Sequence, residues 1–213
     1  MKNGSNHPRL GQEPLTIVPV FYATTEGQTR RIAERIAATL RERGLSSAAF
    51  DVASTKASSI DWNEVDGVVL GASLHIGKYR RQAGEFARTH REALNALPSA
   101  FFGVSLSAAS RNQEEVEAAR KLAHAFAENA GWHPHRIASL AGTLAYTRYG
   151  FLIRFIMRRI ARKEGAPTDA SRDYELTDWA EVARFANEVA DAVLRKEMLA
   201  VKGADRTAEP LMH

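Results

Sequence analysis

Short apolar runs alternate with longer amphipathic stretches along this chain. The apolar runs are rich in β-branched and aromatic residues, which predicts strands at 15–23, 48–52, 66–72, 100–106 and 137–144. In the stretches between them apolar residues recur at helical spacing, which predicts helices at 30–43, 80–97, 112–130 and 178–194. Gly44 stands directly after the first helix, where glycine commonly ends helices. In the helix at 112–130 the residues expected to face inward are Val116, Ala119, Leu122, Ala123 and Phe126.

The regular alternation of strand and helix predicts an α/β domain, with a parallel sheet covered by helices on both faces. Five strands fit the doubly wound order 2-1-3-4-5. Ligands of such sheets bind beyond the carboxyl ends of the strands, beside the switch point between strands 1 and 3. The loops of interest are therefore 24–29, 73–79 and the segment from 105 onward. Pro19 lies in the strand that this order makes central, so we expect a bulge or an early strand start there.

The loop after the first strand reads Thr-Thr-Glu-Gly-Gln-Thr and opens the next helix. Backbone N–H groups and the helix dipole favour an anion at such a position, and Gly27 allows close approach of the backbone. A single phosphate fits this loop. The loop lacks the Gly-Lys-Ser/Thr ending of a P-loop and the G-x-G-x-x-G pattern of dinucleotide sites. The alternative is an ordinary capped helix start, with Thr24 or Thr25 as N-cap.

Composition narrows the chemistry that the domain can perform. Of the 213 residues 45% are hydrophobic and 25% are charged, which fits one globular domain. The chain has no cysteine, which excludes disulfides, thiolate nucleophiles, iron–sulfur clusters and cysteine-bound zinc. Redox chemistry would therefore need a bound cofactor. His133 and His135 have no carboxylate partner close by in the sequence, so we expect no metal site.

The two ends of the chain differ from its middle. Residues 1–14 and 199–213 are polar and contain Gly and Pro, so we expect flexible tails on a domain that spans 15–198. No stretch reaches the roughly 18 consecutive apolar residues that a membrane span needs. The first apolar run contains Pro19 and lacks a small-residue cleavage pattern, so we expect no signal peptide.

An insertion of about thirty residues, 143–176, separates the last strand from the last helix, and insertions of this length are usually functional or disordered. It contains a predicted amphipathic helix at 150–163. Six Lys or Arg residues and no acidic residue lie between Arg148 and Lys163, whereas the net charge of the whole chain is only +4. Such a helix fits an anionic membrane surface or the carboxylates of a substrate, and the alternative is a solvated basic face. The candidate residues are Arg148, Tyr149, Arg154, Arg158, Arg159 and Arg162.

Five segments in order carry a resemblance to a known family. They are 24–29, Gly-Ala-Ser-Leu-His-Ile-Gly-Lys-Tyr at 71–79, Ser-Ala-Phe-Phe-Gly-Val-Ser-Leu at 99–106, Ala-Gly-Thr-Leu-Ala-Tyr-Thr-Arg-Tyr at 141–149 and Tyr-Glu-Leu-Thr-Asp-Trp at 174–179. Over about residues 15–195 the chain resembles the flavodoxin-like, quinone-dependent protoporphyrinogen IX dehydrogenases of bacteria. The resemblance implies a flavodoxin-like fold with a basic insertion and an FMN enzyme of haem biosynthesis. Such an enzyme oxidises protoporphyrinogen IX to protoporphyrin IX with menaquinone or ubiquinone as acceptor, at the inner face of the cell membrane.

The resemblance also implies which residues contact the cofactor, and it implies no nucleic-acid partner. The residues implied to contact FMN are Thr24, Thr25, Glu26, Gly27, Gln28 and Thr29 at the phosphate, Ala72, Ser73, Leu74, His75, Ile76, Gly77, Lys78 and Tyr79 beside the isoalloxazine, and Ser105, Leu106, Ser107 and Tyr146. Neither the spacing of residues nor the resemblance singles out a protein general base, and the flavin itself would perform the redox chemistry. The alternatives are a flavodoxin-like electron carrier and an FMN quinone reductase without porphyrinogen activity. The basic insertion disfavours the electron carrier, since carrier flavodoxins tend to dock on their partners through acidic surfaces.

Overall fold

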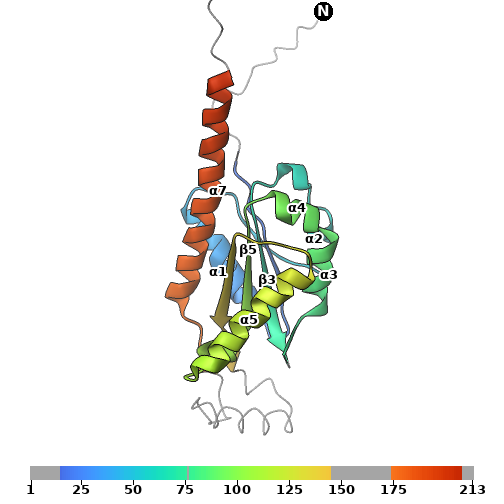
Figure 1. Ribbon diagram of the computed structural model, residues 1–213, viewed down its shortest axis with the longest axis vertical. Helices are drawn as coiled ribbons and strands as arrows, with labels where there is room; N and C mark the ends of the chain where they lie inside the picture. The colour runs from blue at the N-terminus through green and yellow to red at the C-terminus, as the bar shows by residue number, and fades with distance from the viewer. Residues whose placement is uncertain (1–14, 76, 145–173, 208–213) are drawn as a thin grey trace, which may run out of the picture.

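Five strands form one parallel sheet in the predicted order (Figure 1). The computed structural model describes residues 15–75, 77–144 and 174–207, with side chains up to residue 196. Across the sheet the strands are β2 (Ala49–Asp51), β1 (Val20–Ala23), β3 (Val68–His75), β5 (Ser99–Ser105) and β6 (Arg136–Ala141). Phe21 pairs with Leu70, Leu70 with Phe101, and Phe101 with Ile137, all in parallel register. The predicted fold class and strand order are confirmed.

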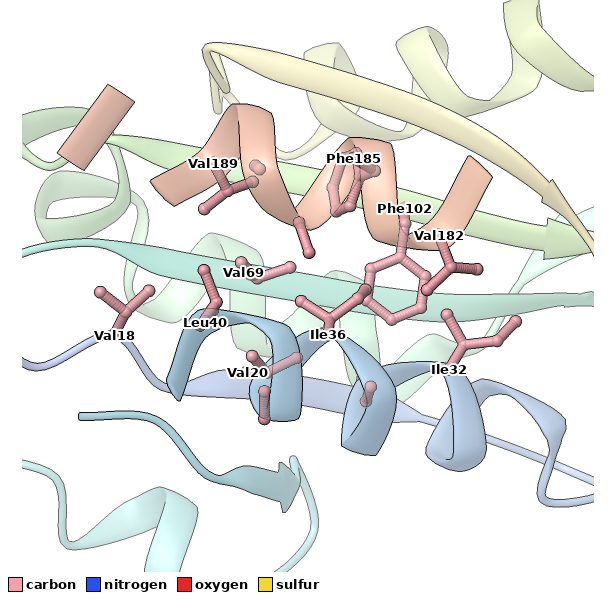
Figure 2. Packing of buried hydrophobic residues seen from close by; sticks show 14 of the residues in the cluster. Val18, Val20, Ile32, Ile36, Leu40, Val69, Phe102, Val182, Phe185 and Val189 are labelled. Carbon is pink, nitrogen blue, oxygen red and sulfur yellow. The ribbon is translucent and has the colours of Figure 1, made fainter. Parts of the chain in front are cut away.

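Helices cover both faces of the sheet and bury two separate cores. On one face lie α1 (Gln28–Glu42) and α7 (Trp179–Thr207), and on the other lie α3 (Arg81–Thr89), α4 (Arg91–Ala96) and α5 (Gln113–Asn129). Figure 2 shows the first core, which is built from Ile32, Ile36 and Leu40 of α1, Val182, Phe185 and Val189 of α7, and Val20, Val69 and Phe102 of the sheet. The helical spacing of these apolar residues explains why each helix buries one face against the strands.

Shorter elements complete the described chain. They are α2 (Thr55–Ser58), the 3-10 helices η1 (Trp62–Glu64) and η2 (Ser107–Ala109), and the two-residue strands β4 (Lys78–Tyr79), β7 (Thr143–Leu144) and β8 (Tyr174–Glu175). The strand β4 folds back antiparallel on the end of β3, and β7 pairs antiparallel with β8. The predicted last strand, 137–144, is therefore two strands, and its second part leaves the main sheet.

Several predicted boundaries differ from the structure. The helix expected at 80–97 is broken at His90, whose ring packs against Trp62 and Phe86 at centroid distances of 5.0 and 4.6 Å. The last helix does not end at Leu194 but continues to Thr207. Leu122 of α5, expected to face inward, is exposed.

The backbone pairing around Pro19 and Gly44 tests two predictions, one about the first strand at Pro19 and one about the end of the first helix at Gly44. Ile17 forms an isolated parallel bridge with Ser46, and β1 begins at Val20, one residue after Pro19. The interruption of the central strand at Pro19 thus takes the form of a strand start, a position that tolerates the missing N–H. At the end of α1 the Gly44 N–H donates to the Arg41 carbonyl and the Leu45 N–H donates to the Leu40 carbonyl. This is the Schellman pattern expected of a glycine that ends a helix.

Candidate functional site

The carboxyl ends of the central strands bring the three predicted loops to one edge of the sheet. Ala23 pairs with Ala72, Ala72 pairs with Gly103, and Ser105 pairs with Ala141, so the loops that follow these strands start side by side. The first two loops also touch, because the hydroxyl oxygens of Thr25 and Ser73 lie 3.4 Å apart. The predicted residues at 24–29, 72–75, 77–79 and 105–107 therefore gather at the switch point of the sheet.

The first loop ends in a helix start that no side chain caps within the described part of the chain. Gly27 is the N-cap of α1 and has φ +94°, a left-handed conformation that glycine adopts at low cost. The expectation that Thr24 or Thr25 caps the helix is wrong, because the Thr24 hydroxyl instead accepts from the Gly27 N–H at 3.0 Å. The N–H groups of the first turn have no acceptor within the helix, and the dipole makes this end attractive to an anion.

Thr29 places a buried hydroxyl in the same turn. The residue is 1% exposed, and its Oγ1 has no hydrogen-bond partner among the described residues. A buried polar group without a partner costs about 1–3 kcal/mol, so native structures rarely contain one without a reason. A ligand that accepts a hydrogen bond at the start of α1 would remove this cost.

The side chain of Gln28 is engaged within the protein. Its Nε2 donates to Glu175 Oε1 at 2.9 Å and to Thr177 Oγ1 at 2.8 Å, and its Oε1 accepts from Arg31 Nη1 at 3.0 Å. Both side-chain N–H groups of Gln28 are thus used within the protein, and its backbone N–H in the first turn is left for a cofactor. No local sequence pattern reveals the contacts of Glu175 and Thr177, because their partner Gln28 lies 147 and 149 residues away.

The second loop is the turn between β3 and β4, where His75 pairs with Lys78. Both of these side chains are exposed at the site. The Tyr79 ring instead makes edge-on contacts with Phe101 and Phe126, at centroid distances of 5.4 and 5.2 Å, and belongs to the second core. Burial raises the pKa of the Tyr79 phenol, so it stays neutral at physiological pH.

Tyr79 can take this position because Gly103 of β5, which faces the ring, has no side chain. A Cβ on Gly103 would lie 2.1 Å from the Tyr79 Oη, so a larger residue there would displace the ring. The Tyr79 hydroxyl is buried and has no partner among the described residues. The contacts observed for Tyr79 are thus with the core, and its contact with the isoalloxazine, which the resemblance implies, stays a prediction.

The third loop is held in a tight turn by Ser105. Its Oγ accepts from the Ala108 N–H at 3.2 Å, and its carbonyl accepts from the Gly142 N–H at 3.0 Å. Leu106 and Ser107 follow at the start of η2. The turn therefore joins the ends of β5 and β6 and presents the backbone of 105–107 at the same edge as the first two loops.

The remaining predicted site residues lie outside the described part of the chain. They are Ile76, Tyr146, Arg148, Tyr149, Arg154, Arg158, Arg159 and Arg162. Within the described ranges, no group of three or more His, Asp or Glu residues is placed to hold a metal ion. The helices of those ranges include none that is both long and apolar enough to cross a membrane.

Comparison with known proteins defines the class of this fold and site. A family model described as a flavodoxin domain matches residues 19–171. The chain therefore belongs to the flavodoxin domain family, and this family implies a flavin cofactor. Solved structures agree on the fold. A short-chain flavodoxin associated with a bacterial microcompartment is 14% identical, with a TM-score of 0.51 over 85% of this chain and 99% of its own. Rubredoxin oxygen:oxidoreductase from Desulfovibrio gigas is also 14% identical, with a TM-score of 0.50 over 87% of this chain and 38% of its own.

Two named relatives indicate to which members of the flavodoxin domain family this chain is similar. The protein named protoporphyrinogen IX dehydrogenase (quinone) in Escherichia coli K12 is 37% identical over 172 residues, which are 80% of this chain and 93% of the relative. The protein of the same name in Leishmania major is 31% identical over 172 residues, which are 80% of this chain and 73% of that relative. The resemblance found in the sequence is confirmed.

Proposed function

We propose that this chain is an oxidoreductase that uses FMN to oxidise protoporphyrinogen IX to protoporphyrin IX, with menaquinone or ubiquinone as electron acceptor. The substrate and the acceptor are supported by the names of the relatives in E. coli and L. major. The choice of FMN is supported by one observation in the structure. The first turn of α1 has no side-chain cap, and Thr29 in that turn has a buried hydroxyl without a partner among the described residues, which supports a phosphate ligand there.

The donor set at this position fits a phosphate ester. Backbone N–H groups of residues 28–30 and the hydroxyls of Thr25 and Thr29 would hold its oxygens, and Gly27 leaves room for them. The positive end of the α1 dipole adds attraction for the negative charge. Thr24 would contribute indirectly, because its hydroxyl already supports the loop at Gly27.

The other two loops would hold the flavin ring system. Residues 72–75 and 77–78 at the end of β3, and residues 105–107 at the end of β5, would contact and orient it and shield it from water. When bound, FMN supplies the hydride and electron chemistry that the side chains of this cysteine-free chain lack. His75 and Lys78 are exposed, and their side chains would offer hydrogen-bond donors to the ring.

The basic insertion would supply the face for substrate and membrane. Arg148, Arg154, Arg158, Arg159 and Arg162 lie within it and can pair with the propionate carboxylates of a porphyrinogen. The same residues favour binding to acidic lipid, where each Lys or Arg contributes about 1 kcal/mol near the surface. Such a face would hold the protein at the inner surface of the cell membrane, where a lipid-soluble quinone is available. Tyr146 would contact FMN, and Tyr149 would contact the substrate or the membrane, as the resemblance implies.

The proposal is tested by an anaerobic assay of the purified protein. After reconstitution with FMN, addition of protoporphyrinogen IX together with a quinone is expected to give porphyrin fluorescence at a rate that depends on the quinone. A protein that takes up no FMN would contradict the cofactor assignment. A protein that binds FMN and forms no porphyrin, but whose chemically reduced flavin is reoxidised by a quinone, would instead be an FMN quinone reductase. One whose reduced flavin does not react with a quinone would fit an electron carrier.

A further inference from the structure

The end of the insertion and the residues directly after it contact the first turn of α1. Gln28 is the centre of this contact, since its amide makes the three hydrogen bonds to Glu175, Thr177 and Arg31 described above. Arg31 also pairs with Glu175, at 3.2 Å between Nη2 and Oε2. The two segments are far apart in sequence, so this contact is a tertiary link between β8 and α1.

The same residues connect to the edge of the sheet and to α7. The Thr177 hydroxyl donates to the Ala141 carbonyl at 2.9 Å, at the end of β6, and the Leu176 N–H donates to the Gly142 carbonyl at 3.1 Å. The Arg31 guanidinium lies 5.7 Å from the centre of the Trp179 ring, at the first residue of α7. Gln28 thus contacts β8 directly, and it is connected to β6 through Thr177 and to α7 through Arg31.

The hydrogen bonds of Gln28 dominate this link energetically. The Arg31 and Glu175 side chains are 55% and 35% exposed, and ion pairs of that kind contribute little. Gln28 is only 9% exposed, so its amide is shielded from water, and losing a partner would leave a buried donor unsatisfied. The link is therefore best tested by removing the hydrogen bond between the uncharged side chains of Gln28 and Thr177.

We propose that Gln28, Thr177 and Glu175 form a positioning joint for the phosphate loop. The joint holds the first turn of α1 so that its N–H groups and the Thr29 hydroxyl are fixed in place before a phosphate arrives. Donors that are already ordered bind a ligand without a further loss of conformational entropy. The residues at the end of the insertion thereby set the preference for FMN over riboflavin, which has no phosphate. This role rests on the proposed use of FMN.

The test compares the affinities of FMN and riboflavin in charge-neutral variants by fluorescence titration. Thr177→Val removes one partner of Gln28 and keeps the side-chain shape, and it is expected to weaken FMN binding about fivefold while the riboflavin Kd stays unchanged. Gln28→Met removes all three bonds and is expected to act in the same direction and more strongly. If Thr177 acts through Gln28, the double variant should bind FMN no more weakly than Gln28→Met alone.

Ser47→Ala is the matched control. The Ser47 hydroxyl donates to the Val18 carbonyl at 2.6 Å, so this variant also loses a hydrogen bond beside α1 but away from the joint. It is expected to leave the ratio of the two affinities unchanged. Equal weakening of both flavins by Thr177→Val, no weakening of either, or additive effects in the double variant would overturn the proposal. A wild-type protein that binds neither flavin would overturn the proposed cofactor and this role together. If Thr177→Val does not fold, the ratio of the FMN and riboflavin affinities in Gln28→Met is compared with the same ratio in Ser47→Ala.

Discussion

The Thr29 hydroxyl permits a test in which stability and cofactor affinity should move in opposite directions. The residue is 1% exposed and its Oγ1 has no partner among the described residues. Valine keeps the shape of the side chain and removes the hydroxyl. Because a buried unpartnered polar group costs about 1–3 kcal/mol, Thr29→Val is expected to raise the free energy of unfolding of the cofactor-free protein by about 1 kcal/mol. Urea denaturation measures this change.

The effect on the cofactor has the opposite sign. In the FMN complex the Thr29 hydroxyl would donate to a charged phosphate oxygen, and hydrogen bonds to charged groups contribute about 1.5–3 kcal/mol. Thr29→Val is therefore expected to weaken FMN binding by about 10- to 100-fold. The affinity for riboflavin, which offers no phosphate, should not change.

Thr39 provides a control on the same helix. It is 4% exposed, and its Oγ1 also lacks a partner among the described residues. Thr39→Val should therefore raise the stability in the same way and leave the FMN affinity as it is. Loss of stability in Thr29→Val, with unchanged FMN affinity, would refute the reasoning, because it would show that the hydroxyl serves the protein and not a ligand.

Three further predictions concern the core, the pH dependence and the insertion. Gly103→Ala places a Cβ 2.1 Å from the Tyr79 Oη and should lower the free energy of unfolding by about 1–3 kcal/mol. The control is Gly84→Ala in the helix α3, where the nearest atom to the new Cβ is 3.4 Å away. This variant should raise the free energy of unfolding by up to about 1 kcal/mol. Burial lowers the pKa of His90 below its ordinary value of 6.5, so the unfolded chain binds the proton more readily and the free energy of unfolding should fall as the pH drops through 6.5. His90→Phe should reduce that slope in denaturation curves, and an unchanged slope would contradict the assignment. Replacing Arg154, Arg158 and Arg162 by Gln should weaken sedimentation with acidic vesicles, and unchanged binding would exclude the membrane role.

Much of the fold could be predicted because it depends on local patterns. The apolar runs predicted all five strands of the parallel sheet, and the helical spacing of Ile32, Ile36 and Leu40 predicted the buried face of α1. The breaks were harder to predict. The helix is interrupted at His90, whose ring packs against Trp62 from an earlier part of the chain. The strand β7 leaves β6 and pairs with β8 at the far end of the insertion.

The site could be located from the sequence but not resolved into the roles of its residues. Loop positions follow from strand order, so the three loops at the edge of the sheet were predicted together. Whether a side chain faces a ligand or the protein depends on tertiary contacts. Gln28 is held by Glu175 and Thr177, and Tyr79 packs over Gly103, and neither contact leaves a local signal in the sequence.

The most direct test of the proposed function is an anaerobic reaction without a quinone. The FMN-reconstituted protein is mixed with protoporphyrinogen IX, and the visible spectrum is followed until it stops changing. We expect the flavin absorbance to fall while porphyrin absorbance appears in a fixed proportion, and we expect added quinone to restore the flavin absorbance. Porphyrin formation without a change in flavin absorbance, or no reaction in a protein that has bound FMN, would contradict the proposed function.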